Sequence, residues 1–385
     1  MDTNAKLKEI LSTINTLSTK DKTQLIERVA VNLKQELIAQ NLVPRKSLKG
    51  LWHNTDTSNG LILSAKHLNR VTHLKPNNTR LFQKLEAATV NLLFYSENEH
   101  PFETFIWEVD EQGSFNLTDF LLDTGFIQTI TEEDFFNLIK SSDIFFKEYT
   151  IAELESEEAR TEQIEAFKQI QDYQTRVLAL LKSQSETVEI FRFEIWEQYD
   201  PIVYEAFDFV VAKLSNTNWL GFTPLIDGMS SYLKNGDFPW IPGKIIPLSE
   251  PNNIHPKTLE LEQQIREILK SNQFPVIQYY GKGTTREFVV EVAESKNLLI
   301  TRLLHNSGSA KVTAWQKFSD YHSDCTDKAE KERLVRYQNL DRLLESNLKN
   351  IKEYVMGSMA VYYVYVIGET QTGDYLGVST IAVHT

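Results

Sequence analysis

The strand-forming stretch Tyr363-Val364-Tyr365-Val366-Ile367 has an earlier counterpart in Phe207-Asp208-Phe209-Val210-Val211. Runs of β-branched and aromatic residues are typical of buried strands. At the same sequence offset, Tyr375-Leu376-Gly377 follows the later stretch and Trp219-Leu220-Gly221 follows the earlier one. This self-similarity indicates that the chain contains two copies of one structural unit.

The remainder of each unit shows the same order of expected elements. Each is expected to begin with a helix, to continue with an extended segment that ends in Glu-Val, and to place a long charged helix before its closing strands. In order, the paired segments are 81–90 and 259–269, 105–109 and 288–292, and 157–182 and 328–349. The sequence offset between the copies is larger at the start than at the end, so extra residues are expected in the middle of the first copy. The pattern predicts an α/β (α+β) fold with two tandem α/β/α sandwich lobes and mixed β-sheets.

Composition divides the chain into five parts. Five of the eleven prolines lie in 228–256, and proline fits neither a helix interior nor a central strand, so this segment is expected to link a lobe at 79–227 to a lobe at 257–385. Helical spacing of Leu and Ile predicts a helical hairpin, followed by a basic docking peptide, at 1–52. A polar linker is expected at 53–78.

Charge and cysteine content limit the partners and the compartment. The formal net charge is −13, which disfavours direct binding to nucleic acid phosphates and suits a basic protein partner. The one cysteine, Cys325, cannot form an internal disulfide, so a reducing compartment is expected. We find neither a signal-peptide pattern nor an apolar run of membrane-spanning length, and we therefore expect a cytoplasmic protein without a membrane partner.

No motif indicates catalysis. The histidines mostly stand alone, and His322 with Cys325 lacks the further ligands of a zinc site. The GKGTT stretch at 281–285 lacks the spacing of a phosphate-binding loop. We therefore expect no enzyme activity, no cofactor and no metal site of the chain's own.

Two stretches resemble a known family. Residues 92–108, which include Tyr95-Ser96-Glu97-Asn98-Glu99, resemble the opening of the nuclease A inhibitor family, and residues 346–385 resemble its closing half. That family contains small acidic α/β/α proteins that block a sugar-nonspecific, magnesium-dependent nuclease. The resemblance covers both copies in a diverged form. Separately, residues 45–52 weakly resemble the tail of antitoxin-like N-terminal modules, over a length too short to carry function.

The resemblance implies which residues bind the partner. In the family, a Ser-Glu loop and the terminal threonine carry inhibition, and the matching positions here are Ser96, Glu97 and Thr385, with Glu99 and His384 beside them. A terminal carboxylate is ionised at neutral pH and is an oxygen ligand of the kind that magnesium prefers, so Thr385 is expected to reach the nuclease's metal. Glu97 is expected to pair with a basic residue that normally holds phosphate.

The two halves of this site lie in different copies. In the second copy the loop is replaced by residues 278–283, Gln-Tyr-Tyr-Gly-Lys-Gly, and the first copy continues into the Pro-rich linker. Three arrangements are compatible with the sequence. The copies form one composite surface, each copy has lost half of its site, or 79–150 and 310–385 form one domain that is interrupted by an insert.

The function that the sequence favours is inhibition of a metal-dependent nonspecific nuclease by blocking its cleft. The alternative is a non-catalytic interaction scaffold, or an antitoxin-like protein, that has diverged from nuclease binding. The two hypotheses differ in whether Glu97 and Thr385 lie on one face of the folded chain.

Overall fold

The computed structural model describes residues 75–96, 99–135, 172–196, 203–225, 244–270, 275–278, 281–285, 288–322, 327–357 and 361–383. All of them belong to the larger of the two compact units into which the chain divides, residues 56–385. The helical hairpin expected at 1–52 lies outside the described residues.

Two five-stranded sheets form the centre of this unit. The first, here called the β14 sheet, has the strand order β11-β12-β13-β14-β3, and the second, the β7 sheet, has the order β10-β7-β6-β5-β4. The β14 sheet consists of β3 (Glu103–Trp107), β11 (Ala310–Ala314), β12 (Lys349–Gly357), β13 (Val361–Glu369) and β14 (Tyr375–Val383). The β7 sheet consists of β4 (Ile127–Ile130), β5 (Ser185–Trp196), β6 (Val203–Leu214), β7 (Trp219–Pro224) and β10 (Phe288–Ala293).

All ladders in the two sheets are antiparallel, so the expectation of mixed sheets was wrong. The closing strands follow one another through short connections, and such connections join antiparallel neighbours. The helical connections then bring the remaining strands to the sheet edges in the same antiparallel sense.

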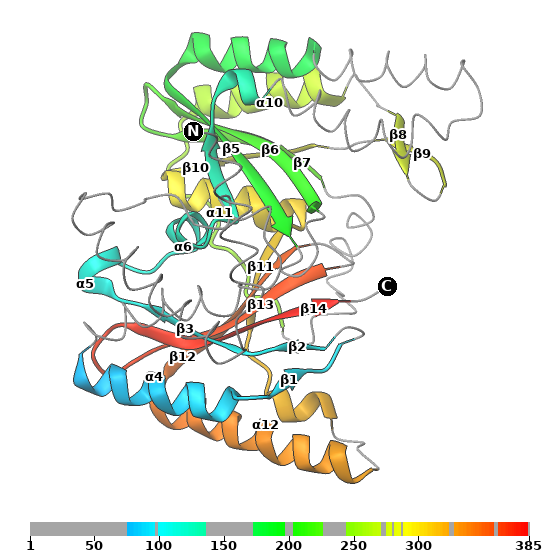
Figure 1. Cartoon of the computed structure of the whole chain (residues 1–385). Coiled ribbons are helices and arrows are strands. Elements are labelled where there is room, and N and C mark those ends of the chain that lie inside the picture. The colour runs from blue at the N-terminus through cyan, green and yellow to red at the C-terminus, as the bar shows by residue number, and fades with distance from the viewer. Residues whose placement is uncertain are drawn as a thin grey trace, which may run out of the picture. The chain divides into compact units, whose positions relative to one another are not determined.

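Helices separate and cover the two sheets (Figure 1). The outer face of the β14 sheet is covered by α4 (Pro76–Thr89) and α12 (Lys328–Asn347), whose leucines share a core with Val364, Val366 and Val378. The outer face of the β7 sheet is covered by α10 (Pro256–Lys270) and a helix at 172–184. A third core lies between the sheets and includes α6 (Leu117–Thr124) and α11 (Lys296–Ser307). We call each sheet with its outer helices the β14 lobe and the β7 lobe.

Each sheet takes its fifth strand from the other copy. Strand β3 belongs to the first copy but pairs with β14, and β10 belongs to the second copy but pairs with β7. The first helix of each copy lies in the same lobe as the exchanged strand. Helix α4 packs against α12, and α10 packs in the core of the β7 lobe. The copies are therefore interlocked, and the layers do not coincide with the segments 79–227 and 257–385.

The closing strands confirm the repeat residue by residue. Gly221 pairs with Val211 in the β6–β7 ladder, and Gly377 pairs with Ile367 in the β13–β14 ladder, at the positions that the sequence offset predicts. A Cβ atom on Gly221 would lie 2.5 Å from the Val210 carbonyl oxygen, and one on Gly377 would lie 1.8 Å from that of Val366. Both copies need glycine here because the neighbouring backbone fills the space of a side chain.

The first strands align differently from the sequence-based expectation. Phe105 pairs with Gly377, and Glu291 occupies the equivalent position against Gly221. The match between Glu108-Val109 and Glu291-Val292 was therefore wrong by three residues. Ladder position is set by pairing along the whole strand, and a shared dipeptide does not fix it.

The end of the Pro-rich segment covers one edge of the β14 sheet. The Ile246 amide donates to the Val312 carbonyl at 3.0 Å, and the Ala314 amide donates to the Lys244 carbonyl at 2.9 Å. These bonds satisfy backbone groups of the edge strand β11, which would otherwise be free to pair with another chain. The chain then enters α10 at Pro256, a favoured residue for a first helical position.

We expect Gly377→Ala to lower the free energy of unfolding by at least about 1–3 kcal/mol, because backbone cannot yield to the added methyl group as a side chain would. Ser379→Ala on the same strand is the matched control and should cost less. Urea unfolding of both variants measures the difference. Equal stability of Gly377→Ala and the unsubstituted protein would show that the close approach to Val366 is not present.

Because each sheet takes its fifth strand from the other copy, the two fragments of a cut chain should bind each other. A break within residues 226–243 leaves two fragments, each of which carries a four-stranded part of one sheet and the fifth strand of the other. Neither fragment should fold cooperatively alone, whereas the two together should form a one-to-one complex with the circular dichroism spectrum of the uncut chain. Two fragments that each fold as independent monomers would contradict the exchange. Size-exclusion chromatography with thermal melts distinguishes the outcomes.

Candidate functional site

The loop that carries Ser96 and Glu97 connects the short strands β1 (Leu93–Phe94) and β2 (His100–Pro101). This hairpin lies against β14, the last strand described. The Thr380 hydroxyl can donate to the Pro101 carbonyl at 3.2 Å or to the His100 carbonyl at 3.4 Å. Strand β14 continues to Val383, which pairs with Val361. The exchange thus places a hairpin of the first copy beside the closing strand of the second.

Helix α12 of the second copy holds the base of this hairpin. The Tyr337 hydroxyl donates to the Leu93 carbonyl at 2.6 Å. The Arg336 guanidinium donates to the Asn91 carbonyl at 2.8 Å and also to the Val90 carbonyl. Arg333 forms an ion pair with Glu99 on the far side of the loop. Positions 333, 336 and 337 share one helical face because residues three and four apart are neighbours on a helix.

The start of α12 is itself fixed by a capping box. The Asp327 side chain accepts a hydrogen bond from the Glu330 amide at 2.8 Å, and the Glu330 side chain accepts one from the Asp327 amide. Two donors at the helix start are thereby satisfied. The face that carries Arg333, Arg336 and Tyr337 therefore begins from a defined first turn.

An aromatic cluster supports the hairpin from inside. Phe102 packs edge-on against Phe318 with ring centroids 4.9 Å apart, and against Phe94 at 5.9 Å. Tyr337 lies at 6.2 Å from Phe102 and completes the cluster. Edge-to-face pairs at such distances add to the stabilisation that burial provides. The hairpin consequently rests on a packed base.

The charges at the hairpin are set by burial and by ion pairing. Burial raises the pKa of Tyr337 to about 12, so its hydroxyl keeps the proton that it donates to Leu93. Burial acts to lower the pKa of Arg333, but the hydrogen bond and charge of Glu99 outweigh it and the pKa is raised. Arg333 therefore remains charged at neutral pH.

The corresponding parts of the other lobe differ in sequence. The hairpin of β8 (Pro275–Gln278) and β9 (Gly281–Thr285) leads into β10 of the β7 sheet. In the sequence, Tyr279-Tyr280 separates these strands and Lys282 is the second residue of β9, where the first copy has the Ser-Glu loop. The closing strand of that sheet, β7, ends at Pro224 and the chain continues. The exchange thus assigns the acidic loop and the last strand of this sequence to one lobe, and their altered counterparts to the other.

Two observations bear on other kinds of site. Among the residues that the structure describes, no group of three or more His, Cys, Asp or Glu side chains is placed to hold a metal ion. Within the same residues, no helix is long and apolar enough to cross a membrane.

A family model described as nuclease A inhibitor-like protein matches residues 79–225 and 286–385, which together exceed half of the chain. The chain belongs to this family. The two matched segments correspond to the two copies, as the repeat predicts. The second match begins after the β8–β9 hairpin, so the altered loop lies outside it. No curated protein matches the chain significantly.

Members of the nuclease A inhibitor-like family are inhibitor proteins without enzymatic activity, and the family implies a nuclease as protein partner. The resemblance seen in the sequence is therefore confirmed, as is the expectation of a non-enzymatic protein. Residues 1–78, with the antitoxin-like stretch at 45–52, lie outside the family match.

The structure locates some of the expected site residues. Ser96 is buried at the end of β1, and Glu99 forms the ion pair with Arg333 inside the chain. Glu97, His384 and Thr385 lie outside the described residues. The structure does describe strands β1 and β2 on either side of the loop, and strand β14, which leads to the last two residues.

Several residues of this site were missed at the level of sequence. Arg333, Arg336 and Tyr337 show a one-face spacing that a helical projection could have revealed, but not the carbonyl groups that they contact. Tyr95, 58% exposed directly before Ser96, is a large aromatic side chain at the loop surface. Such residues often anchor protein interfaces.

We expect Arg336→Ala to loosen the loop. It removes two charge-assisted bonds to the carbonyls of Val90 and Asn91, so amide hydrogen exchange in residues 90–96 should become faster. The matched control is Arg342→Ala, because among the described residues the Arg342 guanidinium bonds to Gln338 and Asn339 within α12 itself. Mass-spectrometric hydrogen exchange measures both. If the amides of residues 90–96 exchange at the same rate in both variants, α12 does not position the loop.

Proposed function

We propose that this protein inhibits a metal-dependent, sugar-nonspecific nuclease by blocking its active-site cleft with the β1–β2 loop and the residues after β14. The observation that carries the proposal is the contact between the β1–β2 hairpin, which presents the loop, and strand β14, which leads to the last two residues. The hairpin and the strand come from different copies. Thr380 of β14 is bonded to the carbonyls of the hairpin that presents the loop. This contact is compatible with a composite surface of two copies and also with one domain, formed by 79–150 and 310–385, that is interrupted by an insert.

Each part of the surface has its own chemical role in this proposal. The carboxylate of Thr385, two residues beyond β14, would approach the nuclease's metal ion, which prefers oxygen ligands. Glu97 would pair with a basic residue that otherwise holds the phosphodiester, and an arginine there could bind both carboxylate oxygens. Tyr95 would add apolar contact beside the loop. Glu99 is already paired with Arg333, so we assign it to holding the loop.

The exchange also implies one inhibitory site per chain. Both elements of the site occur in the β14 lobe, whereas the β7 lobe carries the sequence Tyr279-Tyr280-Gly281-Lys282 in the counterpart loop. A lysine near the tip would repel a cleft that is built to hold phosphate. We therefore propose a one-to-one complex with the nuclease, in the cytoplasm, where a chain with a single cysteine needs no disulfide.

The proposal predicts that Glu97→Ala weakens inhibition by roughly 2–5 kcal/mol in binding free energy, because a buried basic partner is left unpaired. Removal of Thr385, or extension beyond it, should also weaken inhibition and leave the thermal midpoint nearly unchanged. The measurement is cleavage of DNA by a magnesium-dependent nonspecific nuclease with increasing amounts of protein. The titration should reach its end point at one chain per nuclease.

Lys282→Ala in the counterpart loop is the matched control and should inhibit as the unsubstituted protein does. If the intact protein never slows such a nuclease, the interaction-scaffold alternative gains over inhibition. If it inhibits but the extended form inhibits equally well, the role of the Thr385 carboxylate is wrong and the family-level function stands.

A further inference from the structure

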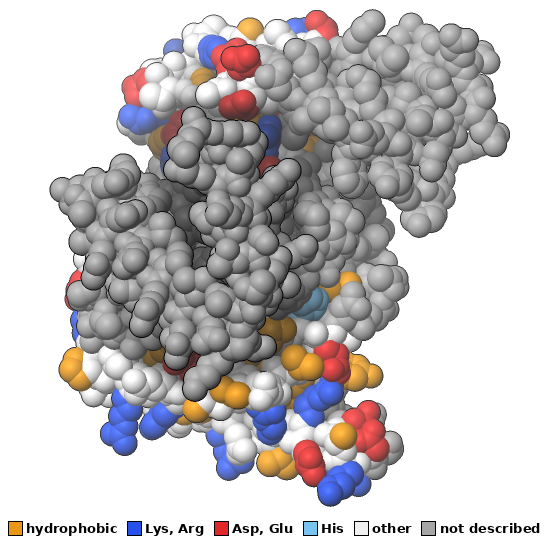
Figure 2. Space-filling view, in the orientation of Figure 1, with side chains coloured by type: hydrophobic (Ala, Val, Ile, Leu, Met, Phe, Trp, Pro, Cys, Tyr) orange, Lys and Arg blue, Asp and Glu red, His pale blue; other side chains and the backbone are white. Residues whose placement is uncertain are grey.

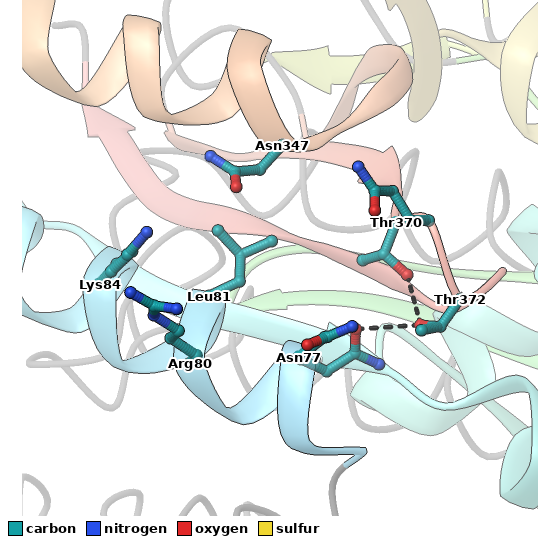
Figure 3. Close-up of a pocket in the computed structure, with 9 residues that line it drawn as sticks. Asn77, Arg80, Leu81, Lys84, Asn347, Thr370 and Thr372 are labelled. Carbon is teal, nitrogen blue, oxygen red and sulfur yellow. Dashed lines mark hydrogen bonds between the residues drawn. The ribbon is translucent and has the colours of Figure 1, made fainter.

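A polar pocket of about 230 Å³ opens at the other end of the β14 lobe (Figure 3). Three elements line it. Asn77, Asn78, Arg80, Leu81 and Lys84 come from α4, Asn347 ends α12, and Thr370, Gln371 and Thr372 belong to the turn between β13 and β14. This turn precedes β14, whereas the β1–β2 hairpin contacts the far part of that strand near Thr380. The nine residues of β14 span about 30 Å at roughly 3.4 Å per residue, so the two sites are well separated.

Two cations at this pocket have no partner among the residues that the structure describes. Arg80 and Lys84 lie four residues apart on α4 and are exposed, and neither forms a hydrogen bond or an ion pair with the described residues. Each of the other arginines in the described part of the chain contacts a carboxylate, a carbonyl or an aromatic ring. Like charges at this spacing repel weakly, and an anion bound between them would remove that repulsion.

None of the residues that line the pocket compensates this positive charge. No carboxylate is among its lining residues. The nearby Asp374 is buried, and it accepts hydrogen bonds from Asn78 at 2.7 Å, from Thr372 at 3.0 Å and from the Val109 amide at 3.0 Å. Lys75 pairs with Asp374 at 3.0 Å and is shared with Asp110, also at 3.0 Å. Burial would raise the pKa of Asp374, but these partners lower it.

The end of α12 opposes an anion, because the C-terminal end of a helix is partly negative. Asn347 reduces this effect, since its side-chain amide donates to the Leu343 carbonyl at 2.8 Å. Basic side chains also gather on the face over α4 and α12 in a chain whose net charge is −13 (Figure 2).

We propose that this pocket binds a phosphate group. The planar guanidinium of Arg80 can donate two parallel hydrogen bonds to phosphate oxygens, and Lys84 adds a second positive charge. The amide of Gln371 supplies a neutral donor at the turn between β13 and β14. The pocket is smaller than the usual range of about 300–1,000 Å³ for organic ligands, so a phosphate with at most a small group attached fits it. The phosphate can be free or can belong to a mononucleotide.

The full-length chain tests this with three probes at constant ionic strength: inorganic phosphate, a nucleoside 5′-monophosphate and the same nucleoside without phosphate. Phosphorus NMR titration and the thermal midpoint should both show saturable binding for the first two and none for the third. Arg80→Ala should weaken binding by roughly tenfold or more, because hydrogen bonds to charged groups are lost, and Arg80→Lys should weaken it less. Lys84→Ala should weaken it also.

Lys270→Ala, at the exposed end of α10, is the matched control and should bind as the unsubstituted protein does. Thermal midpoints without phosphate establish that each variant is folded. The proposal is overturned if neither phosphate probe binds, if Arg80→Ala and Lys84→Ala leave binding unchanged, or if Lys270→Ala weakens it equally. Tighter binding of the monophosphate than of inorganic phosphate identifies a nucleotide source, and equal binding identifies free phosphate. Nuclease inhibition does not enter this test, so either proposal can fail alone.

Discussion

The antiparallel ladder between β3 and β14 is the contact on which the remaining arrangement depends. Five residue pairs, from Tyr375 with Trp107 to Ser379 with Glu103, attach the start of the first copy to the end of the second. Because β1 and β2 immediately precede β3, this ladder also brings the hairpin to the end of β14. Pairing of β10 with β7 is the reciprocal consequence, since the first strand of the second copy then occupies the edge that β3 leaves open.

The exchange joins the two lobes through covalent connections as well as through packing. The core between the sheets contains residues of both, among them Phe105, Tyr365, Phe193 and Phe209, together with Leu303 of α11. Separation of the lobes would expose this core and would also break the exchanged ladders. Burial of apolar side chains and backbone hydrogen bonding therefore oppose separation together.

The hairpin is held by groups that do not belong to the candidate contact surface. Arg336 and Tyr337 bind backbone carbonyls, and Arg333 engages Glu99, so the loop is fixed at its base while Tyr95 remains exposed at its surface. A hairpin base that is fixed before binding loses less conformational entropy when a partner binds.

The sequence by itself determined the repeat, the closing strands and the family. Gly221 and Gly377 are readable in the sequence as equivalent positions because the strands around them are alike at a constant offset. It did not determine which copy supplies the first strand to each sheet, since β3 and β10 are both short apolar strands and β7 and β14 offer similar edges. It also misaligned those first strands by three residues, because the shared Glu-Val carries less weight than the pairing of the whole strand. Only the tertiary structure decided these points, and with them which loop lies beside the end of β14. The physical reason is that strand pairing and the contacts of Arg336 and Tyr337 depend on the packing of distant segments, and the local pattern is satisfied equally by either partner.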